Sequence, residues 1–199
     1  MPTRHFNIPD AECVASINPK HILNQSRVSI ATFEGSLDDP RVALITAFSL
    51  GNRGVHTEVW IGDYRVSTFN PGKCVGIMPL KSDLDLTQWH ITHIPITDAN
   101  QATRFIKELL ASPAEYSISI SEFAMPKMLL DTIDHDLDCC HPEQWDKLFC
   151  TQLALLFLRR CAIAGILDIP KEKQRLLWTV NSKGCLPSRL QIITDHMIS

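Results

Sequence analysis

The sequence predicts an α+β fold in one domain, and three observations lead to that prediction. The chain has 199 residues, a length typical of one domain with a sizeable core. Hydrophobic residues make up 45% and charged residues 21%, close to the averages of globular proteins. Strand-length apolar runs come first and apolar helices follow, an order typical of α+β folds. We expect a decorated N-terminal lead-in at residues 1–40, a core at 41–165, and a C-terminal loop and short helix at 166–199.

The first half of the chain predicts an antiparallel meander of about five strands. The lead-in contains one candidate strand at 27–33, and RVALITAFSL (41–50) is an apolar run of strand length. VHTEVWIG alternates, with His56, Glu58 and Trp60 on one face and smaller side chains on the other. YRVSTFNPG, CVGIMPL and WHITHIPI are three further short candidates, because they are rich in β-branched residues and bounded by turn signals.

Besides the short C-terminal helix, two helices are expected in the second half. Asp98 can cap a helix over 99–111, which Ser112-Pro113 ends. A longer apolar helix is expected from about 143 to 166, where Gly165 lies at the expected end. Between them, YSISISEF is ambiguous between strand and loop, and residues 122–142 read as a short helix or a lid.

Composition and charge exclude several classes of protein. The net charge is −3, the pI is about 6.2, and no block of Lys or Arg stands out, so nucleic acid is not an expected partner. No stretch reaches the ~18 apolar residues of a membrane span, and the N-terminus lacks the apolar region of a signal peptide. We therefore expect a cytoplasmic protein, with action in a host cell left open. The seven cysteines predict reduced thiols, and the oligomeric state stays open.

One apolar run, KLFCTQLALLFLRRC, carries two cysteines, and Cys150 is either core packing or a nucleophile. A nucleophilic thiol needs a lowered pKa, which the first turn of a helix and a nearby imidazole supply. A helix that starts at Pro142 would place Cys150 two turns inside it and remove most of the dipole effect. The sequence leaves both starts open.

His56 is the preferred imidazole among the eight histidines, because it stands at the start of a strand. A hairpin turn near Gly62 would bring the next strand opposite it, within cross-strand reach. Thr68 there, or its neighbours Ser67 and Asn70, is a candidate to orient the ring as a third member of a triad.

The ordered motifs RVALITAFSL, VHTEVWIGDYRVSTFNPGKCVGIMPL, AEYS and KLFCTQLALLFLRR resemble the circularly permuted branch of the NlpC/P60 papain-like superfamily. The resemblance covers residues 41–165 and extends weakly to GCLPSRL. It implies a papain-like antiparallel sheet packed against a nucleophile-bearing helix. It also implies that Cys150 is the nucleophile, His56 the general base, Thr68 the third residue, and Tyr116 a site-lining residue whose hydroxyl helps to hold an oxyanion.

Three positions depart from the family pattern. Cys-Ser-Glu-Leu is here Cys150-Thr151-Gln152-Leu153, Tyr116 is followed by Ser117 instead of Asp, and Thr68 stands where many members have Glu. A threonine hydroxyl adds no charge, so it stabilises an imidazolium less than a carboxylate does. Glu58 is therefore the alternative source of that charge.

The resemblance implies a thiol hydrolase, a cysteine peptidase or amidase, that cleaves an intracellular amide, isopeptide or acyl bond through a Cys-His acyl-enzyme. Its substrate would be a peptide, an amide or an acyl-lipid, and no cofactor is expected. Two alternatives stay open: a catalytically inactive papain-like domain that serves as a binding or assembly module, and a lipid acyltransferase.

Two histidine and cysteine groups invite a metal, and neither predicts one. HDLDCCHPEQWDKLFC lacks the paired two-ligand spacing of structural zinc sites. That segment contains His135, Cys139, Cys140, His141 and Cys150. His90 and His93 lie three apart, so on a strand they point to opposite faces. No phosphate-binding loop spacing is present.

Overall fold

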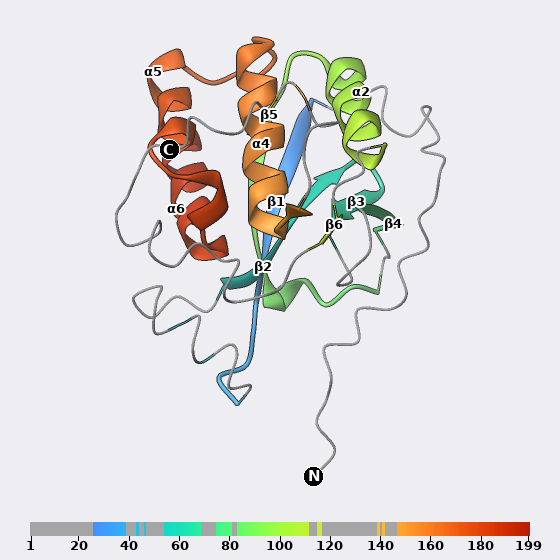
Figure 1. Cartoon of the computed structure of the whole chain (residues 1–199), viewed down its shortest axis with the longest axis vertical. Helices are drawn as coiled ribbons and strands as arrows, with labels where there is room; N and C mark the ends of the chain where they lie inside the picture. Colours follow the sequence, from blue (N-terminus) through green and yellow to red (C-terminus); the bar gives the residue numbers. More distant parts are fainter. Residues whose placement is uncertain are drawn as a thin grey trace.

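The structure is a computed structural model, and it describes residues 26–38, 43, 46, 54–68, 75–80, 83–111, 115–116, 139, 141 and 147–199. In these residues a five-stranded antiparallel sheet is covered on one face by helices (Figure 1). The expected α+β class is confirmed.

The strand order across the sheet is β4-β3-β2-β1-β5, and all neighbours are antiparallel. The bounds are β1 Arg27–Glu34, β2 Gly54–Ile61, β3 Tyr64–Ser67, β4 Gly76–Pro79 and β5 Trp89–Pro95. The first four strands form a meander, and β5 crosses back to pair with β1. The predicted number and direction of strands are thus confirmed.

Two expectations about the N-terminal part differ from the structure. The candidate strand of the lead-in, β1, lies between β2 and β5 and contributes Val28 and Ile30 to the core. The run RVALITAFSL was expected to be a strand, but the two described residues in it, Ala43 and Thr46, have helical backbone. A short apolar run fits a buried helix as well as a buried strand, so periodicity alone does not separate them.

The β2–β3 hairpin turns at the predicted place. Gly62 and Asp63 form a two-residue loop, and Gly62 has a φ of 55°, which glycine adopts without strain. The register pairs Val59 with Val66 and Trp60 with Arg65. Trp60 and Arg65 therefore lie side by side on the same face as Glu58.

The helices follow the sheet in sequence. The bounds are α2 Ala99–Leu110, α4 Cys150–Ile163, α5 Lys171–Gln174 and α6 Pro187–Ile198, with 3-10 turns η2 Leu86–Gln88, η4 Arg175–Trp178 and η5 Ser182–Gly184. The predicted cap of α2 is confirmed, because the Asp98 side chain accepts a hydrogen bond from the Gln101 N–H at 2.9 Å.

Helix α4 starts later than expected and ends where expected. A short parallel pair of strands, β6 Glu115–Tyr116 and β7 Lys147–Leu148, precedes it. Because β7 is extended and paired with β6, the helix cannot run continuously from about 143, and a tertiary contact overrides the helical pattern. At the other end, Gly165 has a φ of 70° and donates to Ala162, while Ile166 donates to Cys161, as in a Schellman motif.

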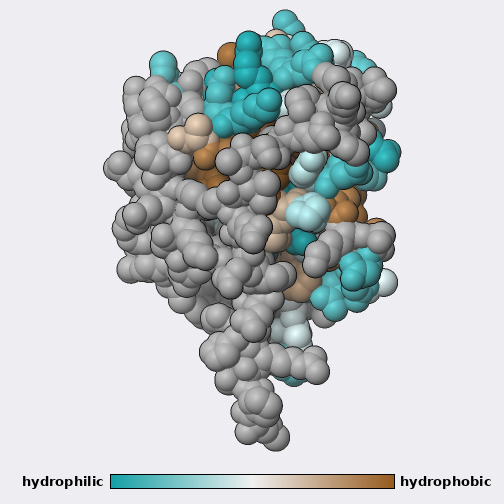
Figure 2. All heavy atoms as spheres, turned by 90° about the vertical axis from the view of Figure 1, so that its right-hand side faces the viewer, coloured by the Kyte–Doolittle hydropathy of each residue, from teal (hydrophilic) through white to brown (hydrophobic). Residues whose placement is uncertain are grey.

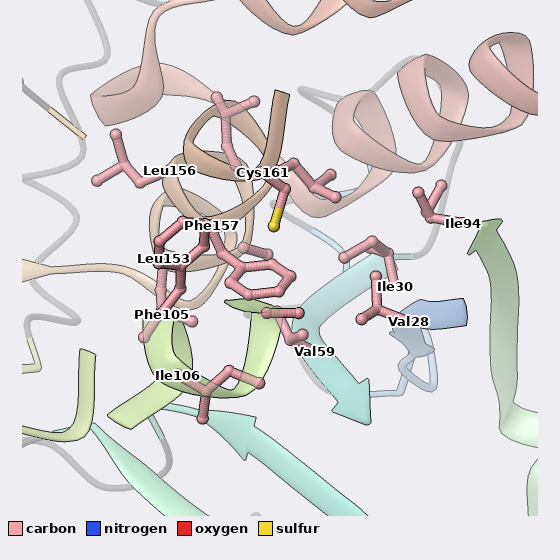
Figure 3. Close-up of a cluster of buried hydrophobic side chains, with 14 of the residues drawn as sticks. Val28, Ile30, Val59, Ile94, Phe105, Ile106, Leu153, Leu156, Phe157 and Cys161 are labelled. Atoms are coloured by element: carbon pink, nitrogen blue, oxygen red, sulfur yellow. The ribbon is translucent and has the colours of Figure 1, made fainter. Parts of the chain in front are cut away.

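The core lies between the sheet and a layer of helices in which α4 stands between α6 and α2 (Figure 1). Figure 3 shows Leu153 and Phe157 of α4 near Phe105 and Ile106 of α2, with Val59 of the sheet close by. The C-terminal segment belongs to the same packing unit, because α6 packs against β1, β2 and β5.

The surface of the described residues is mixed. Figure 2 shows hydrophobic side chains in separate areas between hydrophilic ones. The large hydrophobic side chains that are exposed come from separate elements, among them Leu37, Leu86, Ile163 and Ile192. Among the described residues, no helix combines the length and the apolar character that a bilayer crossing requires.

Candidate thiol site

Cys150 is the first residue of α4, which resolves where the helix starts. Phe149 is the N-cap residue, and its backbone N–H donates to Gln152 Oε1 at 3.3 Å, which fixes the first turn. The positive end of the helix dipole therefore acts on the Cys150 sulfur. The Gln152 side chain thus supports the helix start.

Strand β2 brings His56 and Glu58 to the sulfur. His56 interacts electrostatically with Cys150, and its Nε2 lies 3.4 Å from Glu58 Oε1. The Thr57 backbone N–H also favours the thiolate, and the Thr151 hydroxyl lies 3.8 Å from the sulfur. A thiol, an imidazole and a carboxylate are therefore neighbours, with the imidazole of His56 interacting with both of the other groups.

The charges of Cys150, His56 and Glu58 stabilise one another. Burial disfavours the imidazolium, but the Cys150 thiolate and the Glu58 carboxylate outweigh burial and raise the pKa of His56 from 6.5 to about 10. Burial likewise disfavours the thiolate, yet the charge and hydrogen bond of His56 outweigh it and lower the pKa of Cys150 from its ordinary 9.0. The favoured state is a thiolate–imidazolium ion pair.

Glu58 is buried and held by two further donors. The Arg65 guanidinium donates two hydrogen bonds to it, at 2.7 Å to Oε2 and 2.6 Å to Oε1. The Trp60 indole N–H donates to Oε2 at 2.6 Å. Burial tends to raise the pKa of Glu58, but the interactions with His56 and Arg65 outweigh burial and lower it below 4.5. The carboxylate is therefore ionised.

The other buried thiols behave in the opposite way. Cys161 is part of the hydrophobic core, and burial raises its pKa far above 9.0. Burial also raises the pKa of Cys185, to about 12. The two cysteines of KLFCTQLALLFLRRC thus differ in kind: Cys161 is core packing, and Cys150 has the electrostatic surroundings of a nucleophile. All four described cysteines, which include Cys139, are free thiols.

The two remaining predicted site residues are Thr68 and Tyr116. Thr68 is buried just after β3, and in the described part of the chain its hydroxyl has no hydrogen-bond partner. Continuing the β2–β3 register past its last pair would place Thr68 opposite Thr57 rather than opposite His56. The backbone of Tyr116 pairs with Leu148, two residues before Cys150. The structure therefore brings Cys150, His56 and Glu58 together and sets the Tyr116 backbone beside the chain that enters α4.

Sequence reasoning missed Arg65 and the backbone N–H of Thr57. The alternation of β2 and the turn at Gly62 together place Arg65 on the face of Glu58, so a signal for Arg65 was present. A backbone donor such as the Thr57 N–H leaves no trace in side-chain patterns.

The rival groups lie elsewhere. His90 Nε2 lies 3.0 Å from Asp195 on α6, and His93 Nδ1 lies 2.8 Å from the Ser29 hydroxyl on β1, so the two histidines have separate partners. Of residues 122–142, only Cys139 and His141 are described, so His135, Cys140 and the expectation of a short helix or a lid lie outside the described residues. In the part of the chain that the structure describes, no group of three His, Cys, Asp or Glu side chains could hold a metal ion.

Comparison with known proteins gives no match: no protein-family model, curated protein or solved structure matches this chain. The geometry of the site is therefore the basis for a proposed function.

Proposed function

We propose that this protein is a thiol hydrolase with a permuted papain-like fold, in which Cys150 attacks the carbonyl carbon of an amide, isopeptide or acyl bond. One observation carries the proposal: a free cysteine at the first position of a 14-residue helix, with a lowered pKa, faces a buried histidine that a carboxylate backs. Structural cysteines in apolar surroundings have raised pKa values instead, as Cys161 does.

The first half of the reaction is acylation. The Cys150 thiolate attacks the carbonyl carbon, and the carbonyl oxygen becomes an oxyanion at the positive end of α4. His56, already protonated, gives its proton to the leaving amine or alkoxide as the C–N or C–O bond breaks. Glu58 stabilises the imidazolium before this step and keeps the ring in place. The product is a thioester on Cys150.

The second half is deacylation. His56, now neutral, takes a proton from a water molecule or from another acceptor hydroxyl or amine, whose oxygen or nitrogen attacks the thioester. Cys150 leaves as a thiolate, and the ion pair forms again. Water as acceptor gives hydrolysis, whereas an acceptor amine or alcohol gives acyl transfer, so the same residues serve both outcomes.

The pH dependence of alkylation at Cys150 tests the proposal. Native protein is treated with iodoacetamide over a range of pH, and the labelled cysteines are identified by peptide mass spectrometry. Because the pKa of Cys150 is lowered, we expect labelling of Cys150 to begin well below pH 9.0, while Cys185, whose pKa is raised to about 12, stays unlabelled. Cys185 is thus a control within the same molecule.

Two variants complete the test. His56→Ala removes the imidazolium, so the labelling midpoint of Cys150 should rise to the ordinary thiol value or above it, since burial remains. Cys150→Ala should remove the low-pH labelling. A Cys150 that stays inert until the protein is unfolded, or a profile that ignores His56, would defeat the proposal and favour the binding-module alternative.

A further inference from the structure

We propose that Arg65 is a positioning residue of this site: its guanidinium holds the Glu58 carboxylate ionised and oriented against His56. The inference rests on the proposed thiol chemistry and assigns the support of the histidine to an arginine–glutamate pair. Arg65 binds the Glu58 carboxylate, and in this proposal it acts on His56 and Cys150 through that carboxylate.

The geometry of the pair fits this role. Arg65 on β3 and Glu58 on β2 are diagonal neighbours across the hairpin, and both carboxylate oxygens accept from the guanidinium at 2.6 and 2.7 Å. Two parallel bonds fix the plane of a carboxylate, which a single bond does not do. Oε1 is the oxygen that lies 3.4 Å from His56 Nε2. The two hydrogen bonds from the Arg65 guanidinium therefore orient that oxygen toward the imidazole.

Arg65 is itself fixed by the aromatic side chains around it. Its guanidinium lies over the Trp89 ring, 5.3 Å from the centroid, and Trp89 in turn packs against Trp60 and Phe33 at 5.2 and 5.1 Å. Trp60 also donates to Glu58. A long flexible side chain thus has a defined position before it binds the carboxylate.

The charges around Glu58 indicate that Arg65 compensates the buried negative charge of this carboxylate. The side chain of Glu58 is 1% exposed and that of Arg65 is 13% exposed, so an ionised Glu58 needs a buried cation beside it. His56 is one such cation, but it gives up its proton during the proposed reaction. Opposite them, β1 offers Ala31 and Phe33, which carry no charge, and α4 offers the Cys150 thiolate. Among the residues that the structure describes around Glu58, Arg65 is therefore the cation that keeps Glu58 ionised whether His56 is charged or neutral.

The consequence is a prediction about the thiolate. Without Arg65, burial favours the protonated form of Glu58, and a neutral Glu58 no longer supports the imidazolium. We expect Arg65→Met to move the labelling midpoint of Cys150 about one pH unit toward alkaline, the usual minimum effect of one close charge. Arg65→Lys keeps the charge but cannot form the two parallel hydrogen bonds. Its labelling midpoint should therefore lie between those of the wild type and Arg65→Met.

Three comparisons separate this positioning role from a structural one. The thiolate is followed by labelling and by its ultraviolet absorbance, which does not require reagent access, with Cys150→Ala as the blank. Arg160→Met serves as the matched control, because Arg160 also joins two elements, through Glu108 and the Phe105 ring, at the opposite end of α4. It should lower stability without moving the midpoint. In a Glu58→Gln background, Arg65→Met should cause no alkaline shift, because the residue acts through Glu58.

The possible results distinguish the proposed thiol function from the proposed role of Arg65. A wild-type midpoint near that of an ordinary thiol would remove the proposed function itself. A low wild-type midpoint that Arg65→Met leaves unchanged would overturn only the role of Arg65. An equal alkaline shift on Arg65→Met with and without Glu58, or an equal shift in Arg160→Met, would show that the arginine acts through general stability rather than through the carboxylate.

Discussion

At the scale of single residues, the central difference is between Glu58 and Thr68 as support for His56. Glu58 carries a full charge and faces the ring nitrogen at 3.4 Å, whereas the Thr68 hydroxyl is neutral and has no hydrogen-bond partner in the described part of the chain. An imidazolium in a buried site gains most from an anion. We therefore assign the role of third member of the triad to Glu58.

Two substitutions of similar shape test this assignment. Glu58→Gln removes the charge and should move the labelling midpoint of Cys150 toward alkaline by about one pH unit. Thr68→Val removes a buried hydroxyl without a described partner, so it should leave the midpoint unchanged and the free energy of unfolding equal or up to about 1 kcal/mol higher. Labelling profiles and urea denaturation of the two variants give the answer. An alkaline shift in Thr68→Val alone would restore Thr68 as the third member of the triad.

The residues of the site divide by the kind of signal they leave in the sequence. Cys150 and His56 are predictable because their motifs occur in a recognisable order, and Glu58 follows from the alternation of one strand. Thr68 was favoured because of its place in motifs that resemble a known family, but the charge of Glu58 and its 3.4 Å separation from the imidazole favour Glu58. The role of Arg65 depends on the register of two strands, which pattern reasoning supplies only once the turn at Gly62 is taken as fixed.

At the scale of elements, the two ends of α4 determine what Cys150 can do. The pairing of β7 with β6 delays the helix to Cys150, and the left-handed Gly165 ends it. The end was predictable, because glycine at that position is a local signal. The start was not, because it depends on a partner strand more than 30 residues earlier in the sequence. The helical pattern before Cys150 had no local signal against it.

The C-terminal end of α4 gives a prediction about stability. Gly165 has a φ of 70°, and a Cβ placed there would meet nothing within 4 Å, so a substitution costs only backbone strain. We expect Gly165→Ala to lower the free energy of unfolding by about 1 kcal/mol and Gly165→Asn, which tolerates the left-handed region, by less. Urea denaturation of both variants checks this order. Equal stability of Gly165→Ala and wild type would contradict the strain argument.

At the scale of the whole molecule, the ends of the described chain are part of the same packing unit as the middle. We expected a core at 41–165 between a lead-in and a C-terminal tail. Instead β1 lies inside the sheet, and α6 packs against three of its strands. Composition shows where apolar residues lie but not which distant segments pair, so the fold class and the number of strands were predictable and the strand order was not.

This packing predicts that the C-terminal helix stabilises the fold, and a matched pair of substitutions on α6 tests that prediction. Leu190 is fully buried in the core, whereas Ile192 is 51% exposed. Leu190→Ala should lower the free energy of unfolding by about 2–5 kcal/mol, since it removes a buried side chain and leaves a cavity. Ile192→Ala, two residues further along the same helix, should change it by less than about 0.5 kcal/mol. If α6 were a detached tail, the two variants would have equal stabilities in urea denaturation. A large loss at Leu190 alone would show that the segment after the thiol helix helps to hold the sheet on which His56 and Glu58 lie.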